Sequence, residues 1–144
     1  MRELCLEARR TNLSKVQGFV DELLDGYEYD QNQYIVLQIC IEEIFVNIAD
    51  YAYKGAVGEA TIRAEVTEED GRPVLTMTFI DRGMPFNPLK KKDPDITLPG
   101  EQRPIGGLGI YMVKDRMDDV TYEYKDGCNI LTIMEKLLSP KGRR

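Results

Sequence analysis

Two polar residues beside an apolar stripe, Glu43 and Asn47, could carry chemistry. They are four positions apart, so on a helix both side chains leave the same face, one turn from each other. A carboxylate can take a proton from a hydroxyl group or a water molecule, and an amide oxygen can hold Mg²⁺ while the ion keeps several waters. The pattern predicts a general base beside a metal ligand. The alternative is a solvated helix boundary, to which the neighbouring Glu42 is expected to belong.

Asp81 and Gly83 follow an apolar strand and form the second feature. A buried carboxylate is costly without a partner, and it can only accept hydrogen bonds. The exocyclic amino group of a purine would satisfy it, and adenine and guanine both carry such a group. Gly83 leaves room where a flat ring or a sharp turn comes close. An ordinary Asp-x-Gly turn is the alternative.

The third feature is the cluster Gly106-Gly107-Leu108-Gly109, which opens a short helix. Glycines there expose backbone N–H groups, and a helix N-terminus favours anions. The cluster matches neither the phosphate loop of the G-x-x-x-x-G-K-[ST] type nor the dinucleotide fingerprint. A hinge for the preceding loop is the alternative, and it is compatible with a phosphate site. Taken in order, the three features predict a purine-nucleotide pocket with a metal ligand and a general base.

Hydrophobic periodicity predicts the elements that must position these residues. Helices are expected from about Asn12 or Ser14 to Leu24, from Gln31 to Tyr53 and from Leu108 to about Met117. Strands are expected at Leu4–Ala8, Ala60–Val66, Val74–Ile80, Val120–Tyr124 and Asn129–Leu137, with hairpin turns at Glu69–Arg72 and Lys125–Cys128. The order predicts an α+β two-layer sandwich in which about three helices cover one face of a largely antiparallel, mixed sheet.

The proline-rich segment from Met84 to Pro104 is unusually long for a loop inside a compact domain, and it is expected to be a functional lid. A chain of 144 residues, 42% of them hydrophobic, fits one domain with a real core. We expect that domain to span residues 1–138 and to be followed by a basic flexible tail, 139–144.

Composition excludes several function classes. The net charge of -6 argues against direct nucleic-acid binding, and the lack of histidine rules out Ser-His-Asp and Cys-His nucleophilic systems. Three cysteines without metal-type spacing are expected to be free thiols in a reducing compartment. The N-terminus has no signal-type stretch and no apolar run is long enough to span a membrane, so we expect a cytoplasmic protein.

Three segments resemble the nucleotide-binding boxes of the Bergerat-fold ATPases, the superfamily of gyrase, heat-shock chaperone ATPases, histidine kinases and mismatch-repair ATPases. They are Glu43-Ile-Phe-Val-Asn47, Asp81-Arg-Gly83-Met-Pro-Phe-Asn-Pro88 and Gly106-Gly-Leu-Gly-Ile-Tyr-Met-Val113. The short domain, the Pro-Phe-Asn-Pro sequence and the segment from Met117 onward are most similar to the anti-sigma-factor serine/threonine kinases. The similarity covers nearly the whole chain, from about Arg9 to Leu137.

This resemblance implies a Bergerat-type ATP-binding sandwich with an ATP lid, using ATP and Mg²⁺. Glu43 is then the base that activates the acceptor hydroxyl, and Asn47 is the magnesium ligand. Asp81 binds the adenine amino group and Gly83 lies against the ring. Thr132 matches a family threonine near the adenine.

The resemblance places the phosphates at Gly106, Gly107, Leu108 and Gly109. We also expect Arg103, in the lid, to reach the γ-phosphate.

The chain departs from the family pattern at Asp50 and Tyr51, where many relatives place a basic residue or a histidine three or four positions after the asparagine. An acid near phosphates would repel them unless it binds metal. Lys54 or Arg103 is therefore expected to neutralise that charge.

The main hypothesis is an ATP-dependent serine/threonine kinase that phosphorylates a small antagonist protein and sequesters a sigma factor, with a homodimer implied by resemblance. The alternative is a non-catalytic, nucleotide-sensing module that sequesters a regulatory partner, which Asp50 favours. A detached histidine-kinase catalytic domain fits less well, because the chain has no phosphoacceptor histidine and no dimerisation hairpin.

Overall fold

The computed structural model describes residues 1–90 and 107–138. Five strands form one sheet in the order β1-β2-β3-β5-β4. Their bounds are β1 Arg2–Glu7, β2 Glu59–Glu69, β3 Arg72–Asp81, β4 Asp119–Lys125 and β5 Cys128–Lys136. Every pairing among these strands is antiparallel, so the described sheet lacks the parallel pair that a mixed sheet would contain.

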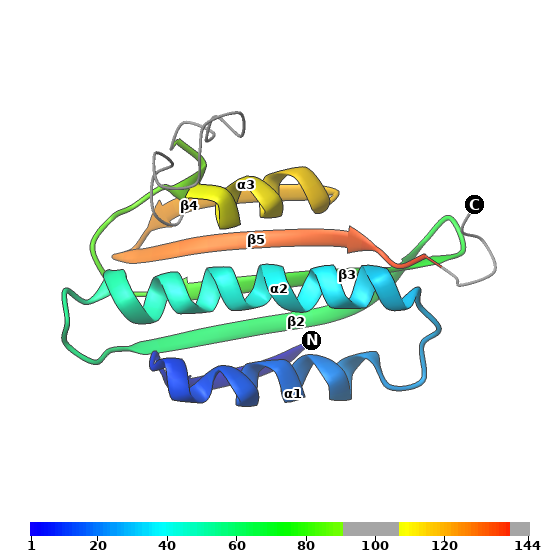
Figure 1. Cartoon of the computed structure of the whole chain (residues 1–144), viewed down its shortest axis with the longest axis horizontal. Coiled ribbons are helices and arrows are strands. Elements are labelled where there is room, and N and C mark those ends of the chain that lie inside the picture. The colour runs from blue at the N-terminus through cyan, green and yellow to red at the C-terminus, as the bar shows by residue number, and fades with distance from the viewer. Residues whose placement is uncertain (91–106, 139–144) are drawn as a thin grey trace.

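Within these residues, three α-helices lie side by side in a layer over one face of the sheet (Figure 1). They are α1 Leu13–Leu24, α2 Gln31–Asn47 and α3 Gly107–Arg116, with short 3-10 turns η1 Arg10–Asn12 and η3 Pro88–Lys90. The two-layer α+β architecture expected from the sequence is confirmed.

The core fills the space between the two layers. Helix α1 contributes Val16, Val20 and Leu24, which recur every four residues and are almost completely buried. From α2 come Leu37, Cys40, Ile41, Ile44 and Phe45, and the sheet adds alternate residues such as Ile62, Met77 and Phe79. Alternation along each strand leaves the other sheet face outside this core.

The first turn of α2 is joined to the end of β5. The Asp30 carboxylate accepts from the backbone N–H of Gln33 at 3.1 Å, which is a helix N-cap. The Gln33 amide then acts like a peptide unit: its Nε2 donates to the Lys136 carbonyl at 2.8 Å and its Oε1 accepts from the Leu138 N–H at 2.9 Å. These contacts hold the helix layer and the sheet in register at this end.

The other end of α2 differs from the prediction of a regular helix to Tyr53. The α-helix ends at Asn47, and a π-helical turn η2 follows from Ile48 to Ala52. At the end of the α-helix the Ile48 N–H is shared between the carbonyls of Ile44 and Phe45. A π-helical turn interrupts the regular α-helix, and such turns are frequent at functional sites. This one lies directly after the predicted metal ligand.

Tyr53 fixes the end of that turn against the sheet. Its hydroxyl accepts from the Arg82 N–H at 2.8 Å and donates to the Glu59 carbonyl at 2.5 Å. The aromatic ring also lies where a Cβ on Gly58 would be. Tyr53 therefore joins the segment after α2 to the strand ends of both β2 and β3.

Both hairpin turns are confirmed. Asp70 and Gly71 have φ values of 53° and 79°, and Asp126 and Gly127 have 54° and 77°. Two successive positive φ values define the type I′ turn, whose twist matches that of the flanking strands.

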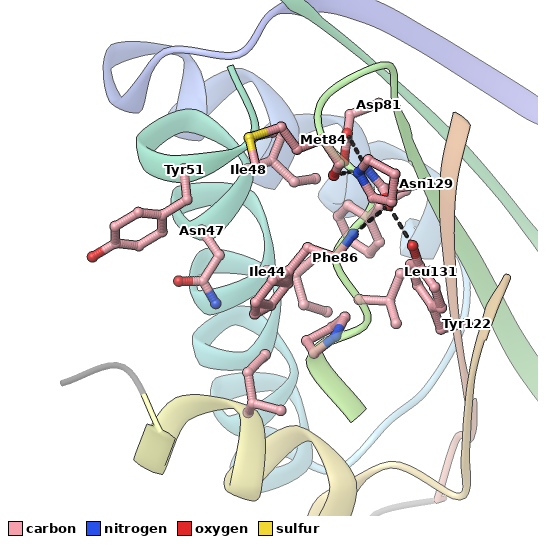
Figure 2. A pocket seen from close by; sticks show the side chains of 15 residues that line it. Ile44, Asn47, Ile48, Tyr51, Asp81, Met84, Phe86, Tyr122, Asn129 and Leu131 are labelled. Carbon is pink, nitrogen blue, oxygen red and sulfur yellow. Dashed lines mark hydrogen bonds between the residues drawn. The ribbon is translucent and has the colours of Figure 1, made fainter. Parts of the chain in front are cut away.

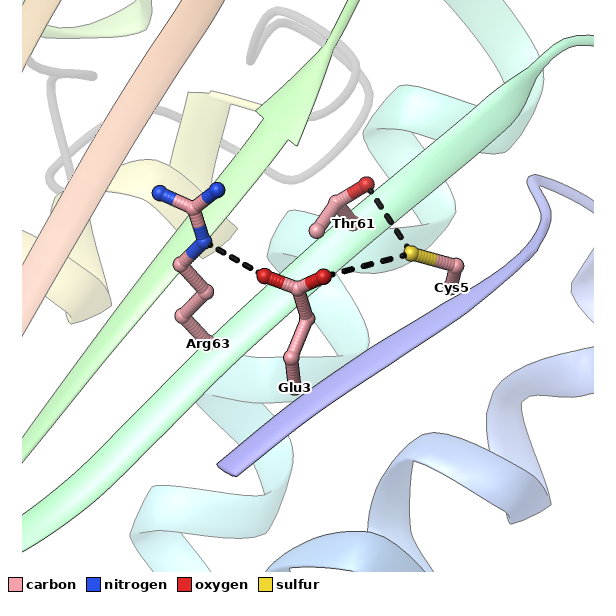
Figure 3. Close-up of polar contacts among 4 residues, drawn as sticks. All are labelled: Glu3, Cys5, Thr61 and Arg63. Atoms are coloured by element: carbon pink, nitrogen blue, oxygen red, sulfur yellow. Dashed lines mark hydrogen bonds and ion pairs between the residues drawn. The ribbon is translucent and has the colours of Figure 1, made fainter. Parts of the chain in front are cut away.

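The sheet face away from the helices carries polar side chains. On β1 and β2, Arg63 Nε donates to the Glu3 carboxylate at 2.7 Å, and the Cys5 thiol lies 3.5 Å from the Thr61 hydroxyl (Figure 3). All three cysteines are free, as expected. Within residues 1–90 and 107–138, no helix is long and apolar enough to cross a membrane.

Candidate functional site

A cavity of about 550 Å³ opens between α2, its π-helical extension, the end of β3 and the start of β5 (Figure 2). This volume is in the range of small-molecule sites. Its apolar walls are formed by Ile44, Ile48, Ala52, Phe79, Ile110 and Leu131. The loop after β3 contributes Met84, Pro85, Phe86 and Pro88. The polar groups are Asn47, Tyr51, Asp81, Tyr122 and Asn129.

Asp81 lies in the wall of this cavity and is only 6% exposed. One carboxylate oxygen, Oδ1, accepts from the Gly83 N–H and from Asn129 Nδ2, each at 2.9 Å. The other oxygen, Oδ2, takes no hydrogen bond from any residue that the structure describes. The turn alternative is therefore present in the Asp81–Gly83 contact, but it uses only one of the two oxygens.

Gly83 is held against the π-helical turn. A Cβ at this position would overlap the carbonyl of Ala52, and the next residue, Met84, donates its N–H to the same carbonyl at 3.0 Å. The close approach explains the glycine through backbone packing. A contact with a ring remains a proposal.

Glu43 lies partly buried on α2 and faces the start of α3. A Cβ on Gly109 would overlap the Glu43 carboxylate, so this helix turn is in contact with the glycine cluster. Burial, followed by the charge of Glu42, raises the pKa of Glu43 above its ordinary value. A raised pKa moves a carboxylate toward the range useful for a general base. The solvated-boundary alternative does not account for the contact with Gly109.

Asn47 is the last residue of α2 and lines the cavity. Its side-chain amide makes no hydrogen bond to any residue in the described part of the chain, so its oxygen can accept a cation. No group of three or more acidic, cysteine or histidine side chains suited to a metal occurs among residues 1–90 and 107–138. A site with a single protein oxygen fits Mg²⁺, which retains water and bridges phosphates.

Asp50 has a partner that the sequence did not reveal. Arg10, in the turn after β1, binds it with two hydrogen bonds, Nε to Oδ1 at 2.9 Å and Nη2 to Oδ2 at 2.5 Å. The guanidinium lowers the pKa of the Asp50 carboxyl. Lys54 or Arg103 was expected to neutralise this charge. Arg10 does so instead, and Arg103 lies outside the described residues.

The assignment of Thr132 is wrong. Thr132 pairs with Thr78 across β3 and β5, and their hydroxyl oxygens are 3.2 Å apart on the face of the sheet away from the helices. Neighbouring positions of a strand point to opposite faces. The residues of β5 that reach the cavity are Asn129 and Leu131.

Asn129 is the main polar residue that sequence reasoning missed. Asn129 alternates with Leu131 and Ile133, which could have placed it on the core face of β5. However, Ile130 and Met134 at the intervening positions are also apolar, so the alternation is ambiguous. Tyr122 of β4 was missed as well, and its hydroxyl donates to Asn129 Oδ1.

The glycine cluster is only partly described. Gly106 lies outside the described residues, as does most of the expected lid. Gly107 is the first residue of α3, and Leu108 and Gly109 follow within its first turn. Residues 107–109 thus form the beginning of the described helix, and the first backbone N–H groups of a helix have no intrahelical acceptor. An anion at this end would be stabilised by them.

The comparisons with known proteins agree with this geometry. The family described as "Histidine kinase-like ATPase domain" matches residues 6–134. Two similar proteins are each named "Serine-protein kinase RsbW", from Bacillus mycoides (strain KBAB4) and Bacillus cereus (strain ATCC 10987 / NRS 248). Both are 36% identical over 110 residues, which is 74% of this chain. The matched region spans 65% of each relative's own length.

A solved structure shows the same fold at low sequence identity. The histidine kinase domain from the Erythrobacter litoralis EL346 blue-light activated histidine kinase superposes with a TM-score of 0.50 at 12% identity. The superposition covers 89% of this chain and 60% of that one. Because the family match extends over nearly all of the described residues, the chain belongs to the histidine kinase-like ATPase domain family.

Proposed function

We propose that this chain is an ATP-dependent protein serine/threonine kinase of the anti-sigma-factor type. The observation that carries the proposal is the position of Glu43. It lies against Gly109 at the N-terminus of α3, one helical turn from Asn47 on the cavity wall. A carboxylate with a raised pKa next to an anion-binding helix end suits transfer of a phosphoryl group to a hydroxyl.

In this mechanism the protein mainly orients groups and accepts one proton. Asp81 Oδ2 would accept a hydrogen bond from the adenine amino group, and the apolar cavity walls would cover the ring. The backbone N–H groups at the start of α3 face the phosphates. Glu43 would take the proton of the acceptor hydroxyl; the oxygen of that hydroxyl would bond to the γ-phosphorus as the bond between the γ-phosphorus and the ADP oxygen breaks. Phosphoryl transfer depends chiefly on such positioning and on charge stabilisation.

Asn47 would hold Mg²⁺ through its amide oxygen. The ion would neutralise charge on the phosphates, as it does in other phosphoryl-transfer enzymes. Asn47 is the last residue of the α-helix, directly before the π-helical turn, and it lines the cavity.

The alternative, a nucleotide-sensing module without activity, was favoured by an uncompensated acid at position 50. The ion pair with Arg10 no longer leaves this acid uncompensated, because the arginine of the same chain neutralises the Asp50 charge. The kinase is therefore the better supported of the two functions.

Further parts of the proposal follow from the resemblance. The substrate would be a small antagonist protein with an acceptor serine or threonine, and the sequestered partner would be a sigma factor. A homodimer in the cytoplasm completes it, with residues 1–138 as the ATP-binding unit and 139–144 as a basic tail. The free thiols are compatible with a reducing compartment.

A stepwise experiment tests this function. Thermal shift with ATP, ADP and GTP, with and without Mg²⁺, should show stabilisation by the adenine nucleotides that Mg²⁺ increases. Incubation with Mg-ATP and a candidate antagonist should then yield a phosphoprotein by mass spectrometry. In Glu43→Gln the transfer rate should fall by about 10²-fold or more while ATP affinity is kept. ATP binding without any phosphoprotein would instead identify the non-catalytic module.

A further inference from the structure

Asn129 is the centre of a hydrogen-bond network at the base end of the cavity (Figure 2). Its Nδ2 donates to Asp81 Oδ1 at 2.9 Å and to the Met84 carbonyl at 2.8 Å. Its Oδ1 accepts from the Phe86 N–H at 3.1 Å and from the Tyr122 hydroxyl. An asparagine amide offers two donor hydrogens and two acceptor lone pairs. All four are used inside the protein, so Asn129 has no position left for a ligand.

The network also fixes which way the amide points. A flipped amide would bring Oδ1 against Asp81 Oδ1 and the Met84 carbonyl, both of which accept hydrogen bonds. It would also bring the NH₂ group against the Phe86 N–H, which is a donor. Only the observed orientation satisfies every partner. Because Asn129 is only 6% exposed, water cannot replace a lost partner without cost.

Two parts of the cavity wall depend on this residue. One is Asp81, whose Oδ1 is occupied by Asn129 and Gly83 so that Oδ2 is the oxygen left for a ligand. The other is the segment from Met84 to Phe86, which forms the outer wall and is bonded to Asn129 at both ends. Met84 and Phe86 are 47% and 59% exposed, so among the described residues their side chains pack only loosely, and the hydrogen bonds to Asn129 carry more of the position of this segment.

We propose that Asn129, held by Tyr122, is a positioning residue for the purine: it aims one carboxylate oxygen of Asp81 into the cavity and sets the distance between β5 and the Met84–Phe86 wall. This proposal rests on the proposed nucleotide site. It assigns a role to Asn129 and Tyr122, neither of which binds the base itself. Substituting either residue should weaken adenine-nucleotide binding while the positions of Glu43 and of the N-terminus of α3 stay the same.

The sharpest variant is Asn129→Asp, which keeps the size of the side chain but replaces the NH₂ donor with an acceptor. Two carboxyl groups would then face each other, and at low pH they can share one proton, which restores a hydrogen bond to Asp81. At high pH both are ionised and repel. Relative to the unaltered protein, the Kd for Mg-ADP should be nearly unchanged at pH 5.0 and about tenfold weaker or more at pH 8.0.

The other ionisable groups around Asp81 do not produce this pattern. Tyr53 and Tyr122 have pKa values raised mainly by burial, so they stay neutral over this range. Cys128 and Tyr124 are present in both proteins, as is the exposed Arg82. Dividing the Kd of Asn129→Asp by the Kd of the unaltered protein at each pH cancels the effects of these shared groups and of the nucleotide phosphates. A ratio that stays within about twofold from pH 5.0 to 8.0 would overturn the proposal, since a residue that only fills space would behave in this way.

Tyr122→Phe provides a second test in case Asn129→Asp is unfolded at pH 8.0. It removes one hydrogen bond and keeps the ring, so Mg-ADP affinity should fall by about fivefold. The matched control is Tyr124→Phe. Tyr124 lies opposite Asn129 on β4, is 46% exposed, and its hydroxyl makes no hydrogen bond within the described part of the chain. Equal affinities of the two variants would contradict the proposal.

Hydrogen exchange in the nucleotide-free protein separates this proposal from the proposed function. The Phe86 amide should exchange more rapidly in Tyr122→Phe and in Asn129→Asp at pH 8.0 than in Tyr124→Phe, after correction for the intrinsic rate. If the unaltered protein binds no adenine nucleotide, the function fails, and this measurement still shows whether the network holds the segment. If the nucleotide binds and Phe86 protection is unchanged in both variants, the function stands and the role of Asn129 is refuted.

Discussion

The Glu43 carboxylate and Gly109 are in contact, and the absence of a side chain at residue 109 is what allows it. The two residues come from α2 and α3, 66 positions apart in the chain, yet one is the predicted base and the other belongs to the predicted phosphate site. A methyl group at Gly109 would meet the far end of a flexible side chain, so Glu43 would move and the helices would stay. The contact therefore ties the position of the base to the first turn of α3.

We expect Gly109→Ala to displace Glu43 and lower the rate of phosphoryl transfer by at least about tenfold, since small misplacements of catalytic groups are costly. The melting temperature should change little, because alanine favours a helix more than glycine does. Single-turnover kinetics and a thermal melt measure the two effects. The matched control is a double-mutant cycle with Glu43→Gln: in that background Gly109→Ala should have almost no further effect on the rate. Fully additive losses would mean that Gly109 acts on the phosphates and not through Glu43.

The pH dependence of transfer should report the environment of Glu43. Burial raises the pKa of this carboxyl, and the base works only when ionised. The rate under saturating Mg-ATP should therefore rise with pH through an acid limb that lies above the ordinary glutamate range, and level off beyond it. In Glu43→Gln the residual rate should lack this limb. A limb that persists unchanged in the variant would assign it to another group.

The Arg10–Asp50 ion pair should matter more for nucleotide binding than for folding. Arg10→Ala leaves a carboxylate uncompensated three residues from Asn47, so Mg-ATP affinity should fall by roughly three- to tenfold, and more at low ionic strength. The free energy of unfolding should change little, because the arginine side chain is largely exposed and solvent screens its ion pair. Isothermal titration at two salt concentrations measures the first effect. Adding Asp50→Asn to Arg10→Ala should restore affinity; a further loss would show that Asp50 itself assists binding.

Glu135 should make the protein less stable as the pH rises. Its side chain is 5% exposed, its Oε2 has no hydrogen-bond partner in the structure as described, and burial raises its pKa from 4.5 to about 7. The folded state therefore binds this proton more tightly than the unfolded state, and stability is lost between pH 4.5 and about 7. In Glu135→Gln this loss should disappear, a relative gain on the order of 2–3 kcal/mol at pH 8 compared with pH 4.5. Denaturant unfolding of both proteins at the two pH values gives the difference, and parallel pH profiles would contradict it.

Much of the fold could be predicted because the periodic signals are strong. The alternation in β2 and β3 around Asp70-Gly71 and the four-residue spacing in α1 each reflect one buried face, and local sequence carries that information. The order of strands in the sheet was not predicted. It depends on which strand edges meet, which is a property of the whole chain.

The site could be predicted only in part, because local sequence describes single elements and not how distant elements pack together. Glu43, Asn47 and Asp81 lie at positions fixed by their own elements. Thr132 was assigned to the wrong face because β5 carries apolar residues on both faces. The sequence therefore does not show which of two neighbouring positions faces the helices, although neighbouring side chains lie on opposite sides of the sheet. The Arg10 contact and the π-helical turn after Asn47 arise from long-range packing, which no local pattern encodes.

The strand order has a consequence for synthesis on the ribosome. β5 is the latest of the five strands to be made, yet it lies between β3 and β4 and supplies Asn129 and Leu131 to the cavity. Until it emerges, the growing polypeptide has one edge of β3 unpaired and one wall of the cavity missing. Nascent chains should therefore remain unable to bind nucleotide, and vulnerable to association through that edge, until translation of this last hairpin is finished.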